Sequence, residues 1–307
     1  MAKELTNINI GIIGPGAIGS LLASLFFRAG NRICCIGTLP AVQSIKKNGI
    51  QIKSSVYGNF TSRPNSSTNP SSIFDLVFVT VKSYELKNSL KTMTDCIGND
   101  TLIVILLNGI GNREIIRSIY SGKVIVGTIG AIEVSLGENR IVNHISPMIP
   151  HIEIASDSDV KFETLTNIAA LIKSAGLSVT IGKNENEVMW RKLIRLCAVA
   201  TMTAISDLPI GKLRSESKLR GQLEQIVSEL CSIALTQGFD CSVVDVMWQI
   251  DTLPENMTTS MQRDIKFAKF TEIESILGEP INLGNKLGLN LPCMKDSYLY
   301  LKTKIAN

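Results

Sequence analysis

Short, almost continuous apolar segments alternate with stretches of helical periodicity over the first half of the chain. These segments consist mainly of Ile, Val and Leu without polar alternation, which is the pattern of parallel strands covered on both faces. They are Ile8 to Ile13, Arg32 to Ile36, Asp75 to Val81, Thr101 to Leu107 and Val124 to Ile129. With helices between them, they predict a Rossmann-type, doubly wound α/β domain.

Three less regular segments belong to the same half. Ile141 to Ile154 and Leu177 to Ile181 are strand-like and could extend the sheet, with antiparallel pairing allowed. Thr61 to Ser72 is rich in Ser, Asn and Pro, so we expect a surface loop or a poorly ordered connection there.

The pattern changes after about residue 183, where helical periodicity continues with few strand signals. The helical stretches are Glu185 to Ile205, Glu216 to Gln237 and Gln262 to Leu287, and Pro280 is expected to end or kink the third. The sequence therefore predicts an α/β domain over residues 1–183 and an all-helical domain over residues 184–307.

Composition excludes several classes of protein. The 307 residues, 45% hydrophobic and 19% charged, are sufficient for two globular cores. The net charge of +4 comes from scattered Lys and Arg, which argues against a nucleic-acid partner. No apolar run reaches the roughly 20 residues that span a bilayer, and the polar start, Met1 to Asn9, is not typical of a signal peptide.

The cysteines and histidines bear on compartment and metal binding. Seven cysteines without a CxxC pair indicate buried, reduced thiols, and hence a cytoplasmic protein. His144 and His151 have no cysteine at ligand spacing, so we expect no metal site.

A glycine-rich segment directly follows the first apolar segment and opens a helical stretch. Gly14 permits a tight turn, Gly16 lets the backbone approach a pyrophosphate, and Gly19 allows the helix to pack closely on the strand. The phosphates of a dinucleotide would then bind at the helix N-terminus. The expected cofactor-binding residues of this loop are Gly14, Pro15, Gly16, Ala17, Ile18 and Gly19.

The end of the second apolar segment bears on the choice of nicotinamide cofactor. An NAD enzyme normally carries Asp or Glu there for the ribose 2′-hydroxyl, but this chain continues as IGTLP, without an acid. Since no negative charge would repel a 2′-phosphate, NADP(H) is favoured over NADH. No Arg follows either, so Thr38 and the backbone would bind the phosphate, with Lys46 or Lys47 nearby.

Further polar residues stand where α/β proteins bind ligands or on the predicted helices. Lys82 and Asn108 end two of the apolar segments, at the carboxyl edge of the expected sheet. In the helical half, Lys192 belongs to a Trp-Arg-Lys-Leu segment, and Ser260 and Glu272 follow at a distance. Taken singly, each of these residues is typical of an ordinary loop or a solvated helix face.

In their order and spacing, these motifs together resemble the ketopantoate reductase (2-dehydropantoate 2-reductase) family over nearly the whole chain. The resemblance implies NADPH-dependent reduction of ketopantoate to pantoate, in pantothenate and coenzyme A biosynthesis. It implies Lys192 as general acid, Glu272 as its partner, and Lys82 and Asn108 as cofactor-facing groups. Substrate would contact Asn108, Lys192 and Ser260. A small-molecule 2-keto acid is then the expected partner, without nucleic acid or membrane, and a homodimer is allowed.

Two positions depart from the family pattern. Leu196 and Ala200 stand four and eight residues after Lys192, where the family commonly has Asn, and their side chains cannot hydrogen-bond a polar substrate. A reductase of another, less polar 2-keto acid is therefore a second hypothesis. A third is a non-catalytic NADP(H)-binding protein, against which the retention of Lys192 and Glu272 speaks.

The spacing of Ser260 and Glu272 carries its own expectation. On one straight helix they would lie about 18 Å apart, which is too far for one small substrate to bridge. Ser260 is therefore expected near a helix start, or in contact with a different part of the ligand.

Overall fold

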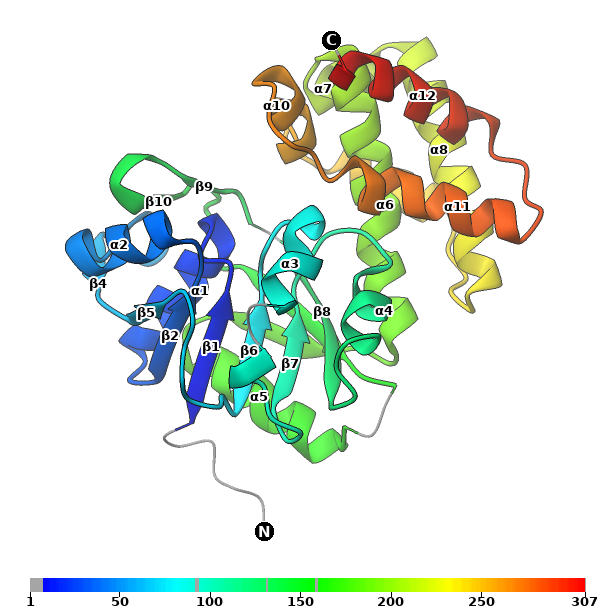
Figure 1. Cartoon of the computed structure of the whole chain (residues 1–307). Coiled ribbons are helices and arrows are strands. Elements are labelled where there is room, and N and C mark those ends of the chain that lie inside the picture. The colour runs from blue at the N-terminus through cyan, green and yellow to red at the C-terminus, as the bar shows by residue number, and fades with distance from the viewer. Residues whose placement is uncertain (1–7, 92–93, 131, 158–159, 307) are drawn as a thin grey trace. The chain divides into compact units, whose positions relative to one another are not determined.

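The computed structural model describes residues 8–91, 94–130, 132–157 and 160–306, so most of the polar N-terminal segment lies outside the described residues. The chain divides into two compact units (Figure 1). Unit 1 contains Met1–Leu107 and Asn112–Val188. Unit 2 contains Asn108–Gly111 and Met189–Asn307.

Unit 1 is built on an eight-stranded sheet of strand order β12-β11-β8-β7-β6-β1-β2-β5. All neighbouring pairs are parallel except β11 with β8, which confirms the expected doubly wound sheet. The expected extension of this sheet by Ile141 to Ile154 is right only for its C-terminal part, because Ile141–His144 pairs in a separate sheet. The strands are β1 (Asn9–Ile13), β2 (Arg32–Ile36), β5 (Asn65–Ser67), β6 (Leu76–Val79), β7 (Leu102–Ile105), β8 (Val124–Gly130), β11 (His151–Ala155) and β12 (Ser178–Ile181).

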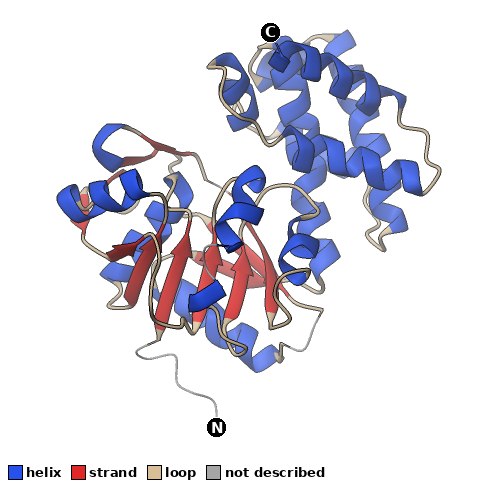
Figure 2. Ribbon diagram, viewed as in Figure 1, coloured by secondary structure: helices blue, strands red, loops and turns tan. Residues whose placement is uncertain are grey.

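Apolar residues cover both faces of this sheet, which explains the lack of polar alternation in its strands. Successive residues belong to different cores: Ile12 packs with helices α1 (Ala17–Arg28) and α5 (Phe162–Ser174), while Ile13 packs with α3 (Leu86–Lys91) and α4 (Asn112–Arg117). Helices therefore flank the strands on both sides (Figure 2).

A second sheet of four strands, in the order β4-β3-β10-β9, packs against α1 and was not expected. Its strands are β3 (Ile50–Ser54), β4 (Phe60–Ser62), β9 (Val134–Leu136) and β10 (Ile141–His144). Helix α2 (Leu39–Asn48) precedes β3. Unit 1 also contains three short 3₁₀ helices among its described residues: η1 (Ser83–Glu85), η2 (Thr94–Cys96) and η3 (Glu138–Arg140).

The expectation of a loop over Thr61 to Ser72 is wrong in part. β4 and β5 both fall there, and β5 pairs with β2 at the edge of the main sheet. The buried hydroxyl of Ser62 donates a 2.7 Å hydrogen bond to Ser24 of α1. Because backbone groups supply the ladder bonds, a polar segment can form an edge strand.

Unit 2 is helical throughout its described residues, as expected (Figure 2). Its helices pack around one apolar core to which Trp190, Leu193 and Leu230 contribute. They are α6 (Glu185–Ser206, which begins in unit 1), α7 (Ile210–Ser215), α8 (Ser217–Thr236), α9 (Val243–Asp251), α10 (Ser260–Lys266), the π-helical turn η4 (Glu274–Gly278), α11 (Glu279–Lys286) and α12 (Pro292–Ala306).

The third expected helical stretch, Gln262 to Leu287, is interrupted. α10 ends at Lys266, and Ala268 adopts a left-handed conformation with φ of 50° that no helix continues. The chain becomes helical again only after Glu272. Pro280 lies inside a continuous helical run, directly after the π-helical turn η4, so the regular α-helix is interrupted next to the proline, as expected.

All seven cysteines are free thiols, and Cys35, Cys96, Cys197 and Cys231 are buried. In the part of the chain that the structure describes, no helix combines the length and the apolar character needed to cross a membrane.

Candidate active site

The glycine-rich loop of unit 1 connects β1 to α1 and has a shape that only glycine allows. Gly14 has a φ of +81°, and a Cβ added there would lie 2.4 Å from Cγ1 of Val81. A Cβ at Gly19 would lie 2.3 Å from the carbonyl oxygen of Gly14. At Gly16, in contrast, a Cβ would meet no atom closer than 4.0 Å. The backbone is thus open at the residue that precedes α1, which fits a diphosphate seated on the helix N-terminus.

Hydrogen bonds fix this loop from two sides. The hydroxyl of Thr80, just after β6, donates to the carbonyl oxygens of Ile13 and Gly14, each at 2.9 Å. The hydroxyl of Ser20, in the first turn of α1, donates to the carbonyl oxygen of Pro15 at 2.9 Å. Hydrogen bonds within the protein therefore hold the shape of this loop.

Lys82 stands at the carboxyl end of β6, next to the loop. It directly follows Val81, whose side chain packs under Gly14, and it precedes the short 3₁₀ helix η1. Its position matches the expectation of a group near the cofactor loop.

Thr38 is the exposed last residue of the β2–α2 connection and forms the N-cap of α2. The preceding Gly37 packs against the ring of Pro15 in the glycine loop. Lys46 and Lys47, however, lie in the last turn of α2, about 12 Å along the helix axis from Thr38. The helix therefore places these two lysines at its end opposite Thr38, and their part in binding a phosphate stays a prediction.

Arg140 is a cation beside the loop that the sequence reasoning missed. Its Nη2 donates a 2.9 Å hydrogen bond to the hydroxyl of Ser20, which in turn bonds Pro15. Arg140 and its neighbour Asn139 have φ values of 61° and 53°, a conformation that is rare outside glycine. Its buried Nε has no hydrogen-bond partner among the residues that the structure describes. Because 120 residues separate Arg140 from Ser20, no local motif could have signalled the contact.

Unit 2 brings three of the candidate site residues together. The amine of Lys192 on α6 donates a 2.8 Å hydrogen bond to Oδ1 of Asn108. The side-chain nitrogen of Asn108 donates to Oε2 of Glu272 at 3.4 Å. Glu272 is buried, with 4% of its surface exposed. The amide of Asn108 thus bridges an amine and a carboxylate that lie far apart in the sequence.

The backbone around Asn108 explains why this short segment packs within unit 2. Gly109 has a φ of +84°, and a Cβ added there would lie 2.2 Å from the carbonyl oxygen of Ser275. The N–H of Ile110 donates to that same carbonyl at 3.0 Å. Ser275 lies in the π-helical turn η4, three residues after Glu272. The close approach that glycine permits therefore fixes Asn108 beside Glu272.

The surroundings of Lys192 alter its acidity. Burial lowers the pKa of its ammonium to about 8, from an ordinary 10.5. The carboxylate of Glu272 opposes this effect and raises the pKa, while the guanidinium of Arg195 lowers it further. An ammonium with such a pKa can release its proton near neutral pH, as a general acid must.

Ser260 is the first residue of α10, as the spacing argument required. The preceding Thr259 caps the helix, and its hydroxyl lies 2.9 Å from that of Thr203 on α6. Thr203 is about 16 Å along α6 from Lys192. Among the described residues, no hydrogen bond connects Ser260 to Lys192 or its two partners, so Ser260 is not brought into this cluster.

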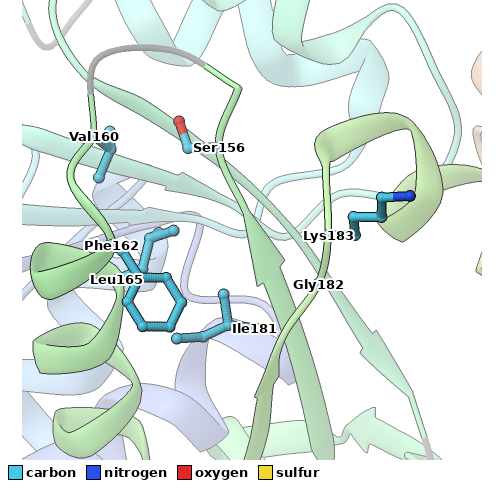
Figure 3. A pocket seen from close by; sticks show the side chains of 7 residues that line it. All are labelled: Ser156, Val160, Phe162, Leu165, Ile181, Gly182 and Lys183. Atoms are coloured by element: carbon cyan, nitrogen blue, oxygen red, sulfur yellow. The ribbon is translucent and has the colours of Figure 1, made fainter.

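A separate hollow lies in unit 1, near β11, β12 and the start of α5 (Figure 3). Its lining includes Ser156, Phe162 and Lys183. Three strands separate β11 from β1, which leads into the glycine loop. None of the candidate site residues lines this hollow.

Comparison with known proteins gives matches over both halves of the chain. The family described as ketopantoate reductase PanE/ApbA matches residues 10–156, and its C-terminal counterpart matches residues 184–304. A 2-dehydropantoate 2-reductase from Pyrococcus horikoshii is 29% identical over 289 residues, which cover 93% of each chain. One from Escherichia coli O157:H7 is 25% identical over 293 residues, which cover 93% of this chain and 91% of the relative.

Solved structures share the fold. A D-mandelate dehydrogenase in complex with NADH and anilino(oxo)acetate has a TM-score of 0.90 at 23% identity, covering 97% of this chain and 98% of its own. A PanE/ApbA family ketopantoate reductase from Ralstonia eutropha has a TM-score of 0.87 at 24% identity, covering 97% and 99%. With both domains matched, the chain belongs to the PanE/ApbA family of ketopantoate reductases, which are oxidoreductases.

Proposed function

We propose that this protein reduces ketopantoate to pantoate with NADPH, and that Lys192 is the general acid. The observation that carries the proposal is the hydrogen-bonded cluster of Lys192, Asn108 and the buried Glu272. The similarity to curated 2-dehydropantoate 2-reductases along the chain supports ketopantoate as the substrate. This activity would serve pantothenate biosynthesis.

Each member of the cluster has a part in moving one proton. When bound, the nicotinamide supplies a hydride to the keto carbon. The ammonium of Lys192 donates a proton to the oxygen on which negative charge develops, a contribution of about 10²–10⁴-fold in rate. Oδ1 of Asn108 holds the amine in place, and Glu272 favours its charged form.

The cofactor would lie on the glycine loop, with its diphosphate against the open backbone at Gly16. Two features support NADPH over NADH. The segment from Gly37 to Pro40, which connects β2 to α2 and begins that helix, carries no acid that would repel a 2′-phosphate. In addition, Arg140 supplies a cation at Ser20, next to the Pro15–Gly37 contact at the end of β2.

A second candidate function is the reduction of a bulkier, less polar 2-keto acid. Leu196 and Ala200 support it, because neither can hydrogen-bond a hydroxyl group of the substrate. The similar structure of a D-mandelate dehydrogenase shows that this fold accommodates anilino(oxo)acetate in another protein. Lys192 and its partners would act in the same way on either substrate.

We further propose that the protein works in the cytoplasm, where its seven free thiols would stay reduced. A homodimer is proposed as well, since a dimeric ketopantoate reductase from Staphylococcus aureus is among the similar structures. Sedimentation velocity at several protein concentrations would separate a dimer from a monomer.

The test of the proposed function is the oxidation of NADPH, followed by absorbance, with ketopantoate and phenylglyoxylate offered in turn. Lys192→Ala is expected to lower kcat/KM by about 10²–10⁴-fold, because it removes the acid. Lys212→Ala, at an exposed lysine of α7, is the matched control and keeps full activity. Turnover of phenylglyoxylate alone would establish the second candidate. Equal rates for Lys192→Ala and the parent would contradict the role of Lys192.

A further inference from the structure

The face of α6 that carries Lys192 has an open stretch one turn long. Between Lys192 and Ala200, only Lys192, Arg195 and Leu196 are half-buried, and the other residues are buried. Residues three and four apart share one face of a helix, so these three side chains project from the same side. A ligand that reaches the amine of Lys192 from this side therefore meets Arg195 and Leu196 as well.

Arg195 projects from this face of α6 as a half-buried cation. Within the described residues, no hydrogen bond or ion pair engages its guanidinium, although burial lowers the pKa of the group. A half-buried cation without a counterion is costly, and such groups concentrate where an anionic ligand completes the site. Other arginines of the chain are paired: Arg113 and Arg117 bind Glu185, and Arg220 binds Asp251.

The spacing of the two cations matches the chemistry of a 2-keto acid. On a helix, the Cβ atoms of residues i and i+3 lie about 5–6 Å apart. In a 2-keto acid, the carbon of the keto group is bonded directly to that of the carboxylate. One cation can therefore reach the keto oxygen while the other reaches the carboxylate.

On this basis we propose that Arg195 binds the carboxylate of the substrate and so sets specificity for 2-keto acids over neutral carbonyl compounds. This rests on the proposed function of Lys192. The guanidinium would form two parallel hydrogen bonds to the carboxylate oxygens, a geometry that lysine does not reproduce. It would provide an anchor on a helix face where Leu196 and Ala200 offer none.

The assignment also explains how one site can keep its acid charged. In the free protein, Arg195 lowers the pKa of Lys192 through repulsion between the two cations. A bound carboxylate would neutralise Arg195 and thereby remove that repulsion. Lys192 would then hold its proton more firmly when a substrate is present to receive it.

The test compares acid and ester substrates in Arg195→Met and Arg195→Lys. For phenylglyoxylate or ketopantoate, whichever the parent protein reduces, Arg195→Met is expected to raise KM about 10- to 100-fold, while Arg195→Lys recovers part of the loss. The KM for the ethyl ester of the same acid should not change, since an ester has no carboxylate. Arg191→Met, at an exposed position of the same helix, is the control. Affinity for NADPH, followed by fluorescence, should stay constant in all variants.

A binding measurement separates this proposal from the function on which it rests. Calorimetric titration of anilino(oxo)acetate into the complex with NADP⁺ needs no turnover. If the parent binds it and Arg195→Met does not, the carboxylate site holds even where no keto acid is reduced. Equal affinity in the two proteins, no binding to the parent, or an equal rise in KM for acid and ester would each overturn the role of Arg195.

Discussion

At the scale of single residues, Asn108 is suited to its position because an amide offers a donor and an acceptor at once. Its oxygen accepts from Lys192 and its nitrogen donates to Glu272. An aspartate could satisfy the lysine but would leave two carboxylates facing each other. Glu272 thus acts on Lys192 across a neutral amide. Its charge raises the pKa of the amine and so partly offsets the lowering caused by burial.

The pH dependence of reduction should report the ionisation of Lys192. Since burial brings its pKa to about 8, the rate of reduction is expected to fall as the pH rises through that value. Glu272→Gln removes the charge that raises this pKa, so the alkaline fall should move to lower pH. Profiles of kcat/KM between pH 5 and about 10 would check both effects. The exposed Glu279 provides the control Glu279→Gln, and an unmoved fall in Glu272→Gln would refute the coupling.

Arg140 should contribute more to NADPH binding than to NADH binding. Arg140→Met is expected to weaken NADPH about 10-fold or more, because a charge-assisted contact to the 2′-phosphate is lost, and to affect NADH much less. Fluorescence titration with each cofactor gives the two dissociation constants. Lys46→Met, at the far end of α2, should leave both constants unchanged. Equal losses for the two cofactors would assign Arg140 a purely structural part.

At this scale, the sequence allowed a prediction only for residues that belong to a recognisable motif. The resemblance brought Lys192, Asn108 and Glu272 to attention, and the structure joins them. Arg140 and Arg195 gave no such signal. The role of each arginine depends on its neighbours in space: Arg140 contacts a serine 120 residues away, and Arg195 has no carboxylate paired with it among the described residues. The pattern of residues along the chain does not reveal such neighbours.

At the scale of helices and strands, the apolar pattern predicted elements where burial decides structure. The five apolar segments became β1, β2, β6, β7 and β8 because both faces of the main sheet are covered. The second sheet escaped prediction, since its short strands are partly polar and depend on α1 for their packing. The break after Lys266 escaped too, because it rests on the left-handed backbone of Ala268, which has no glycine to announce it.

A buried carboxylate ties two helices of unit 1 together. Glu185, at the start of α6, accepts from Arg117 at 2.7 Å and from Arg113 at 3.2 Å, and its side chain is 1% exposed. Glu185→Gln should lower the free energy of unfolding by about 3 kcal/mol, because it leaves Arg117 without its counterion and Arg113 with only the exposed Glu114. Urea denaturation would measure this. Glu114→Gln, which removes an exposed partner of Arg113, should cost about 0.5 kcal/mol or less. Similar costs for both variants would show that burial of Glu185 adds nothing.

At the scale of the whole molecule, each unit has its own apolar core, and the proposed roles divide between them. The glycine loop belongs to unit 1, and the cluster of Lys192 belongs to unit 2. Loss of cofactor binding and loss of the acid should therefore be separable by substitution.

Thermal unfolding tests that separation. NADPH at 100 times its Kd should stabilise the protein by about 2.7 kcal/mol, seen as a rise in Tm. Gly16→Val should abolish the rise, because its side chain would fill the open space over the loop, yet it should leave the Tm of the free protein nearly unchanged. Lys192→Ala should retain the rise. A Gly16→Val protein that still gains stability from NADPH would exclude this loop as the phosphate site.

The membership of Asn108–Gly111 in unit 2 has a consequence for how such proteins can be recombined. A chimera that joined the first 188 residues of this chain to the helical half of a relative would inherit its Asn108 segment from one parent and the surface that receives it from the other. Gly109 would then face a foreign carbonyl in place of that of Ser275, at a distance that tolerates no misfit. Exchange of the helical half between relatives should therefore succeed only when these four residues travel with it. The unit that can be exchanged between relatives is therefore compact in space but encoded by two separate segments of the gene.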